Sequence, residues 1–200
     1  MKFVLATQNQ KKKAEMAAIL SSLGVEIVTE EDLGVHVEVE ETGTTFAENA
    51  ALKAKTVMEA TGLPAIGDDS GLCVDAMNGA PGVYSARYGG EGLSDEERYR
   101  LVLEAMAGQT DRRAHFETVV CCAMPNGDWF AARGTCQGTI AFAPRGENGF
   151  GYDPIFFVTE LRKTFAELTP EEKAAISHRG NAMRTFREKL EAYLKEHPEE

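Results

Sequence analysis

The sequence predicts an α/β fold in which helices flank a mixed, elongated β-sheet. Strand-like apolar segments alternate with capped helical segments through the first hundred residues, a pattern typical of α/β proteins. A hairpin signal then follows, with Pro125-Asn126-Gly127-Asp128 between strand-like segments at 115–124 and 129–136. We expect two lobes, with the active site in the cleft between them. The pattern does not specify the strand order.

Composition indicates one folded unit. The 200 residues are 43% hydrophobic, enough for one sizeable core, so we expect a single domain over 1–200 whose acidic tail, 196–200, is mobile. The formal net charge of -11 argues against nucleic acid as a partner. No apolar stretch has the length of a membrane span, and the apolar start at 3–6 is too short for a signal peptide. We therefore expect a cytoplasmic protein with no membrane partner.

The cysteines show no C-x-x-C spacing and fall in apolar or strand-like segments. We expect buried free thiols rather than disulfides or a zinc site. The four residues are Cys73, Cys121, Cys122 and Cys136. His115 lies inside a strand-like segment and is interpreted as structural.

A polar turn joins an expected strand at 2–6 to a helix that ends at Gly24. Such a turn presents backbone N–H groups at the positive end of the helix dipole, where phosphates bind. Lysines at 11–13 add charge although cations oppose the dipole, so an anion site and a solvated basic face both stay open. The P-loop pattern is absent. The turn and the first helical residues are Thr7, Gln8, Asn9, Gln10, Lys11 and Lys12.

Acids are expected at the ends of two strands. Residues 35–39 alternate valine with polar residues like a half-buried strand, which leads to Glu40 before a helix capped by Thr45. Glu40 is either a metal ligand or a solvated loop acid. An apolar run also leads to Asp68 and Asp69 before a Ser-Gly turn signal. Burying adjacent carboxylates is costly unless a cation or proton intervenes, so this pair indicates either a metal site or a turn cap.

Glycines and aromatic residues gather in the second half of the chain. We expect a shaped loop at 78–90, and Phe150-Gly151-Tyr152-Asp153 either stacks on a planar ligand or forms a packed turn. Capping boxes start helices at Ser94 and Thr169, and the second of these helices stops at 177–180. The last helix is expected to serve packing alone, through Met183, Phe186, Leu190 and Leu194.

The remaining polar groups form two sets. The acids at expected strand ends are Glu40, Asp68 and Asp69, and the donors or cations at helix edges are Asn9, Lys12, Lys53, Lys173, His178 and Arg179. Acids, a metal ion and cations together provide the chemistry of phosphoryl groups, whose charge must be neutralised before water attacks. Mg²⁺ held by one or two carboxylates leaves coordination positions for phosphate oxygens and water.

Six motifs occur in order along the chain. They are Thr7-x-Asn9-x-x-Lys12-x-x-Glu15, Glu41-Thr42-Gly43-x-Thr45-Phe46-x-Glu48-Asn49-Ala50, Asp68-Asp69-Ser70-Gly71-Leu72, Gly79-Ala80-Pro81-Gly82-x-Tyr84-Ser85-Ala86-Arg87-Tyr88, Phe150-Gly151-Tyr152-Asp153-Pro154 and Ser177-His178-Arg179. This set resembles that of the ITP/XTP pyrophosphatases, which hydrolyse non-standard purine nucleoside triphosphates. The resemblance runs from the first strand to the last helix and favours the metal interpretation of the aspartate pair.

The resemblance implies Mg²⁺-dependent hydrolysis of ITP, dITP and XTP, with Mn²⁺ as a substitute ion. The products are the monophosphate and pyrophosphate, and the reaction removes these nucleotides from the pool. The family's metal ligands correspond to Glu40 and Asp69, and its general base to Asp69. Because a metal-bound carboxylate is a poor base, Asp68 is kept as a rival for activating water. A homodimer is also expected.

The resemblance assigns the phosphates to the turn from Thr7 to Lys12, with Ser70 assisting and Lys53 among the substrate-binding residues. It assigns the base and sugar to Phe150, Gly151, Tyr152, Asp153, Lys173, His178 and Arg179. Donors that face the 6-oxo group of these purines would reject adenine by about 1–3 kcal/mol per mismatch. The sequence does not indicate how guanine is excluded.

One residue departs from the family pattern, and two alternative functions stay open. The family usually has a small residue at Gln8, and a glutamine there is strained if the turn needs a positive φ. Pyrimidine triphosphates, as in Maf-like pyrophosphatases, are the alternative substrates. A nucleotide-binding sensor without turnover is the non-enzymatic alternative, which the intact acid pair disfavours.

Overall fold

The structure is a computed structural model that describes residues 1–198, so Glu199 and Glu200 of the predicted acidic tail lie outside the described residues. Seven strands form one sheet in the order β2-β1-β3-β4-β5-β6-β7. β1 (Lys2–Leu5) is parallel to β2 (Glu26–Thr29) and to β3 (Ala65–Val74), whereas β6 is antiparallel to β5 and β7. The predicted mixed α/β sheet is therefore confirmed. No helix within residues 1–198 is long and apolar enough to cross a membrane.

The chain divides into two compact units. The first contains Met1–Asp69, Thr118–Arg133 and the chain from Ala182 onward, and the second contains Ser70–Glu117 and Gly134–Asn181. Three strands contribute residues to both units, namely β3, β4 (Arg113–Ala123) and β5 (Trp129–Ile140). The predicted hairpin is confirmed as β4 and β5.

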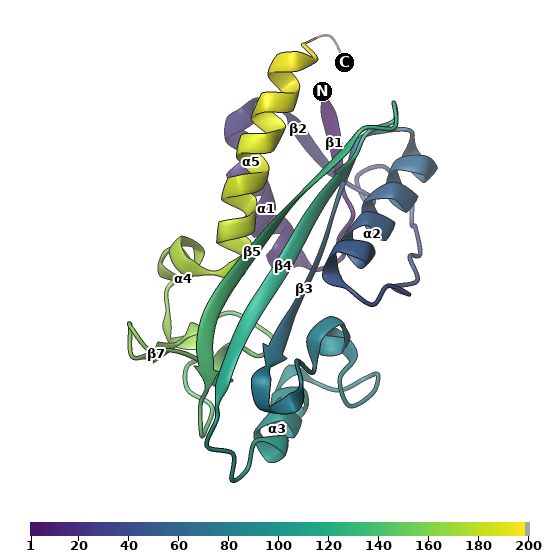
Figure 1. Cartoon of the computed structure of the whole chain (residues 1–200). Helices are drawn as coiled ribbons and strands as arrows, with labels where there is room; N and C mark the ends of the chain where they lie inside the picture. Colours follow the sequence, from purple (N-terminus) through teal and green to yellow (C-terminus); the bar gives the residue numbers. More distant parts are fainter. Residues whose placement is uncertain (199–200) are drawn as a thin grey trace. The chain divides into compact units, whose positions relative to one another are not determined.

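Helices cover both faces of the sheet in the first unit (Figure 1). On one face, α1 (Gln10–Leu20) and α5 (His178–Glu196) contribute Met16 and Phe186 to a core with Phe3 of β1. On the other face, α2 (Phe46–Thr61) contributes Val57 to a smaller cluster with Val4. Since side chains alternate along a strand, adjacent residues of β1 serve opposite faces. The packing role predicted for the last helix is confirmed.

The second unit has its own core around Phe116, Phe156 and Phe165. Its further elements are α3 (Asp95–Ala105), α4 (Pro170–Ile176), β6 (Phe156–Val158), β7 (Lys163–Thr164) and the 3-10 turns η2 (Asp75–Met77), η3 (Gly82–Arg87), η4 (Asp153–Ile155) and η5 (Phe165–Glu167). The capping boxes predicted at Ser94 and Thr169 are both present. Each satisfies two backbone N–H groups at the start of its helix.

The strand predicted over Val35–Val39 is wrong, because this segment is a loop. The backbone N–H of Val35 bonds to the carbonyl oxygen of Glu30, and that of Val37 bonds to the Glu30 carboxylate at 3.0 Å. Val35 itself is 37% exposed. Because the turn satisfies these backbone groups, the alternating valines need no neighbouring strand.

The expectation that Asp68 and Asp69 end a strand is also wrong. β3 runs without interruption from Ala65 to Val74, so the Ser-Gly pair lies inside the strand. Nearly every residue of β3 is buried, and burial in a central strand overrides the local preference of Asp, Ser and Gly for turns. The two acids are consecutive strand residues, so their side chains lie on opposite faces.

The remaining expectations concern the cysteines and the chain end. All four cysteines are buried and none forms a disulfide, as predicted. α4 ends at Ile176 with Ser177 as its C-cap, so the stop predicted at 177–180 is confirmed, and α5 begins directly afterwards with the His178-Arg179 pair in its first turn. The same helix continues to Glu196, and the ring of His197 stacks on Tyr193 at 4.2 Å between centroids.

Candidate active site

The turn between β1 and α1 is built around Asn9, the N-cap of α1. Its Oδ1 accepts hydrogen bonds from the backbone N–H groups of Lys11 and Lys12, each at 3.1 Å. Asn9 therefore uses two of the N–H groups that the sequence offers to a phosphate. Gln8, Asn9, Gln10 and Lys11 remain exposed side chains.

Lys12 turns inward and forms an ion pair with Asp68. Its Nζ lies 3.0 Å from Asp68 Oδ2, and the two side chains are 16% and 3% exposed. Lys53 of α2 donates a hydrogen bond to the backbone oxygen of Asp68, also at 3.0 Å. Asp68 is thus held by a lysine on one side while a second lysine contacts its backbone, which gives Lys12 a role that the sequence did not explain.

Asp69 is buried among α2 and β4 residues. It is 5% exposed and accepts a hydrogen bond from Asn49 Nδ2 at 3.1 Å, while Thr118 donates to its backbone oxygen. Burial is the main reason that the pKa of Asp69 is raised to about 6; the negative charge of Glu41 acts in the same direction, and Lys53, Asn49 and Lys12 oppose the shift. A carboxyl group with this pKa exchanges protons near neutral pH.

Glu41, rather than Glu40, faces this cluster. Glu41 Oε1 lies 2.6 Å from Lys53 Nζ, and the pair is largely shielded from solvent, whereas Glu40 is exposed. Burial alone would lower the pKa of Lys53, but the charges of Asp68, Glu41 and Asp69 outweigh that effect and raise it. The sequence analysis missed Glu41 and Asn49 as site residues, although both stand in the second of the six motifs. The assumed strand at 35–39 misled the choice between the two glutamates.

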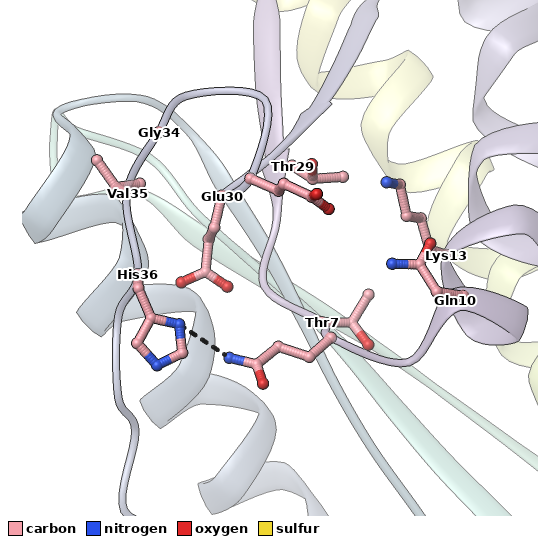
Figure 2. A pocket seen from close by; sticks show the side chains of 10 residues that line it. Thr7, Gln10, Lys13, Thr29, Glu30, Gly34, Val35 and His36 are labelled. Carbon is pink, nitrogen blue, oxygen red and sulfur yellow. Dashed lines mark hydrogen bonds between the residues drawn. The ribbon is translucent and has the colours of Figure 1, made fainter.

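A pocket of about 470 Å³ adjoins the same turn. Its lining comes from the turn, from α1, and from the end of β2 and the segment after it. The lining residues are Thr7, Gln8, Gln10, Lys13, Thr29, Glu30, Glu31, Gly34, Val35 and His36. Figure 2 shows Glu30 and His36 pointing into it. Gln8 Nε2 lies 3.4 Å from His36 Nδ1. Gln8 does not adopt a positive φ, so the anticipated backbone strain is absent. Its side chain instead connects the turn to the 30–36 segment.

The second unit gathers the residues that the sequence assigned to a nucleobase. Lys173 Nζ lies 2.7 Å from Asp153 Oδ2 and 4.7 Å from the centre of the Phe150 ring. The guanidinium carbon of Arg179 lies 5.5 Å from the same ring, and its Nη2 lies 3.4 Å from Ser70 Oγ. The cationic groups of Lys173 and Arg179 therefore both lie near the Phe150 ring, so hydrogen-bond donors stand beside an aromatic surface.

Several members of this group are deeply buried. Asp153, Lys173, His178 and Arg179 are each less than 9% exposed. Burial raises the pKa of Asp153, and the positive charge of Lys173 opposes this shift. The His178 ring stacks on Phe116 with 4.6 Å between centroids.

Tyr152 and Gly151 support the Phe150 turn. The Tyr152 ring belongs to the second unit's core, and its hydroxyl donates to the Ser85 backbone oxygen at 2.6 Å. Ser85 in turn accepts a hydrogen bond from the backbone of Leu72. The backbone N–H of Gly151 bonds to Asp95 at 2.8 Å. Tyr152 is thus a packing residue that joins the Phe150 turn to the 82–87 turn, and Ser85 joins the 82–87 turn to β3.

The fold makes this an α/β protein, with a mixed sheet and buried carboxylates that pair with lysines. Comparison with known proteins shows its family. The chain matches the model of the Ham1 family over residues 3–189. It is 48% identical over 195 residues to a dITP/XTP pyrophosphatase of an Exiguobacterium species, covering 98% of this chain and 100% of that protein. It is 52% identical to the dITP/XTP pyrophosphatase of Thermus thermophilus, covering 96% of this chain and 92% of that protein.

A solved structure agrees with these relatives. The Ham1 protein of Staphylococcus aureus superposes with a TM-score of 0.89 at 43% identity, covering 96% of this chain and 100% of that chain. The chain belongs to the Ham1 family. The resemblance predicted from the six motifs is therefore confirmed.

Proposed function

We propose that this protein is a nucleoside triphosphate pyrophosphatase that hydrolyses ITP, dITP and XTP to the monophosphate and pyrophosphate. The names of the related proteins support this substrate class. The observation that carries the proposal is the cluster of the first unit, where Asp69 and Glu41 lie with Lys53 and where Lys12 pairs with Asp68. Carboxylates beside lysines suit a reaction on a polyanion.

The residues of this cluster fit Mg²⁺, which binds oxygen ligands. Asp69 and Glu41 are carboxylates whose like charges act on one another, and a divalent cation would relieve that repulsion. We assign the metal to these two residues and substitute Glu41 for the predicted Glu40, which is exposed. When bound, Mg²⁺ supplies charge neutralisation for phosphate oxygens; Mn²⁺ offers the same chemistry.

Asp69 is the proposed general base. Its pKa of about 6 in the metal-free protein means that the carboxylate is ionised at neutral pH and can accept a proton from water. Bound Mg²⁺ would lower that pKa and weaken the base, and Asp69 is kept in this role because Asp68 is already paired with Lys12. Water then bonds to phosphorus as the bridging P–O bond between the α- and β-phosphates breaks. Asp68 is engaged by Lys12, so we assign it a positioning role.

The substrate-binding roles follow the predicted residues. Lys12, Lys53 and the turn from Thr7 would contact phosphates, with Ser70 assisting. In the second unit, Lys173 and Arg179 offer donors beside the Phe150 ring, which suits a 6-oxo purine. An amino group at that position would face a donor and lose about 1–3 kcal/mol per mismatch.

Pyrophosphate release from ITP, XTP, dITP, GTP, ATP and TTP in the presence of Mg²⁺ tests the proposal. We expect fast release from the first three and slow release from ATP. Equal rates on ATP and ITP would refute the substrate assignment, and a preference for TTP would favour the Maf-like alternative. Tight ITP binding without turnover would instead support a sensor.

The proposal also covers the cellular compartment and the oligomeric state of the enzyme. Four buried cysteines without disulfides are consistent with the reducing cytoplasm. We propose a homodimer, and light scattering at several concentrations would test it. A monomer mass throughout would overturn that assignment.

A further inference from the structure

One face of the sheet in the second unit carries polar ligand groups. Leu72, Ala114 and Phe116 lie in the unit's core. Because strand side chains alternate, their neighbours on β3 and β4, Cys73, His115 and Glu117, lie on the opposite face. Residues i and i+2 of β4 thus stand beside the β3 cysteine.

These three residues bring their ligand atoms close together. The Cys73 sulfur, a His115 ring nitrogen and a Glu117 carboxylate oxygen all lie within 4.8 Å of one another, and the His115 Nε2 to Glu117 Oε2 distance is 3.6 Å. In a tetrahedral zinc site, metal–ligand bonds of about 2.0–2.3 Å put ligand atoms roughly 3.3–3.7 Å apart. Small side-chain rotations would therefore bring the trio into coordination.

We propose that Cys73, His115 and Glu117 form a binding site for Zn²⁺ or a chemically similar ion such as Co²⁺. One thiolate, one imidazole and one carboxylate make three ligands, and water would complete the tetrahedron. Sulfur and imidazole favour such ions over Mg²⁺, so this site differs in selectivity from the carboxylate cluster of the first unit. Within residues 1–198 it is the one group of three or more His, Cys, Asp or Glu side chains with this spacing.

Access and proton balance are compatible with binding. The side chains of His115 and Glu117 are 27% and 16% exposed, so an ion can reach them, while Cys73 is 8% exposed. Coordination replaces the S–H bond of Cys73 with a sulfur–metal bond and releases one proton to solvent. Cys73 and Glu117 exchange existing interactions for metal bonds when the ion binds.

Binding would cross-link adjacent strands. Cys73 belongs to β3 and the other two ligands to β4, so the bound ion holds these strands together in the second unit. An ion that binds the folded state alone stabilises it in proportion to its concentration above the dissociation constant. The interpretation of His115 as merely structural is then incomplete.

Titration with Co²⁺ in excess Mg²⁺ tests this site. A cobalt–thiolate bond gives a near-ultraviolet charge-transfer band, which we expect in the wild-type protein and not in Cys73→Ser. Cys136→Ser is the matched control, because Cys136 is also a buried free cysteine of the second unit and should leave the band intact. His115→Asn should weaken Co²⁺ binding about tenfold or more.

Absence of the band from wild-type protein, or its persistence in Cys73→Ser, would overturn the proposal. Circular dichroism would verify that the variants remain folded. Pyrophosphate release from ITP by Cys73→Ser should match that of the wild type when no Zn²⁺ is present. The metal site and the proposed enzymatic function can therefore fail independently.

Discussion

Replacing Asp69 by asparagine should abolish pyrophosphate release and, in the presence of a chelator, make the folded protein more stable at neutral pH. The carboxyl pKa is raised from its ordinary value of 3.8 to about 6 by burial. At about 1.4 kcal/mol per pH unit, keeping this group ionised costs the folded state about 3 kcal/mol. Asparagine removes that cost and keeps an oxygen that can accept the hydrogen bond from Asn49.

The sign of this effect depends on pH. Below pH 3.8 the carboxyl group is mostly protonated in both the folded and unfolded states, so asparagine and aspartate should give similar stability. As pH rises from 3.8 to about 6, the unfolded chain ionises while the folded protein retains its proton, and the wild type loses stability. Above that range the advantage of Asp69→Asn reaches its full value.

Urea denaturation at pH 4 and pH 7.5 measures this difference, and pyrophosphate release from ITP measures activity. Asp68→Asn is the matched control, because it leaves Lys12 without its ion-pair partner and should destabilise the protein by about 1–3 kcal/mol at pH 7.5. Near-normal kcat in Asp69→Asn would refute its role as the base. Equal stability changes at the two pH values would refute the assignment of a buried carboxyl group with a raised pKa at Asp69.

Further variants test the remaining assignments. Glu41→Gln should raise the Mg²⁺ concentration needed for half-maximal pyrophosphate release at least tenfold, whereas Glu40→Gln should change it little; the reverse ranking would restore the glutamate predicted from sequence. Arg179→Ala should raise KM for ITP with an unchanged circular dichroism spectrum, and an unaltered KM would remove this residue from substrate binding. Gly67→Ala should destabilise the protein by about 1–3 kcal/mol in urea denaturation, because a Cβ there would lie 2.7 Å from the backbone nitrogen of Ala54 in α2. Wild-type stability of that variant would mean that α2 can move away.

Local signals were reliable where the interactions are local. The caps at Ser94 and Thr169 lie within one helical turn of their partners, so the sequence specifies both ends of each bond. At Thr45 the prediction was half right. Its hydroxyl accepts from Glu48 as expected, but the Glu48 carboxylate accepts from the Thr44 backbone instead.

Local signals failed where distant residues decide. Asp68-Asp69-Ser70-Gly71 has the composition of a turn, yet it lies inside a strand buried on both faces. The valines at 35–39 have the alternation of a strand, yet they lie in a loop where Glu30 accepts hydrogen bonds from the backbone N–H groups of Val35 and Val37. Hydrophobic periodicity indicates that a segment is partly buried. It does not specify which other segment packs against it, because that depends on the tertiary structure.

The sequence by itself determined the family and the α/β class and supplied the candidate site residues, because six ordered motifs and the helix caps can be recognised from local sequence alone. Only the tertiary structure decided the division of labour among the acids. Asp68 and Asp69 are adjacent in sequence but lie on opposite faces of β3, so one pairs with Lys12 while the other is buried beside Asn49. The choice of Glu41 over Glu40 also depends on the tertiary structure. The two glutamates are adjacent in the sequence, but it is the Glu41 carboxylate that lies beside Lys53.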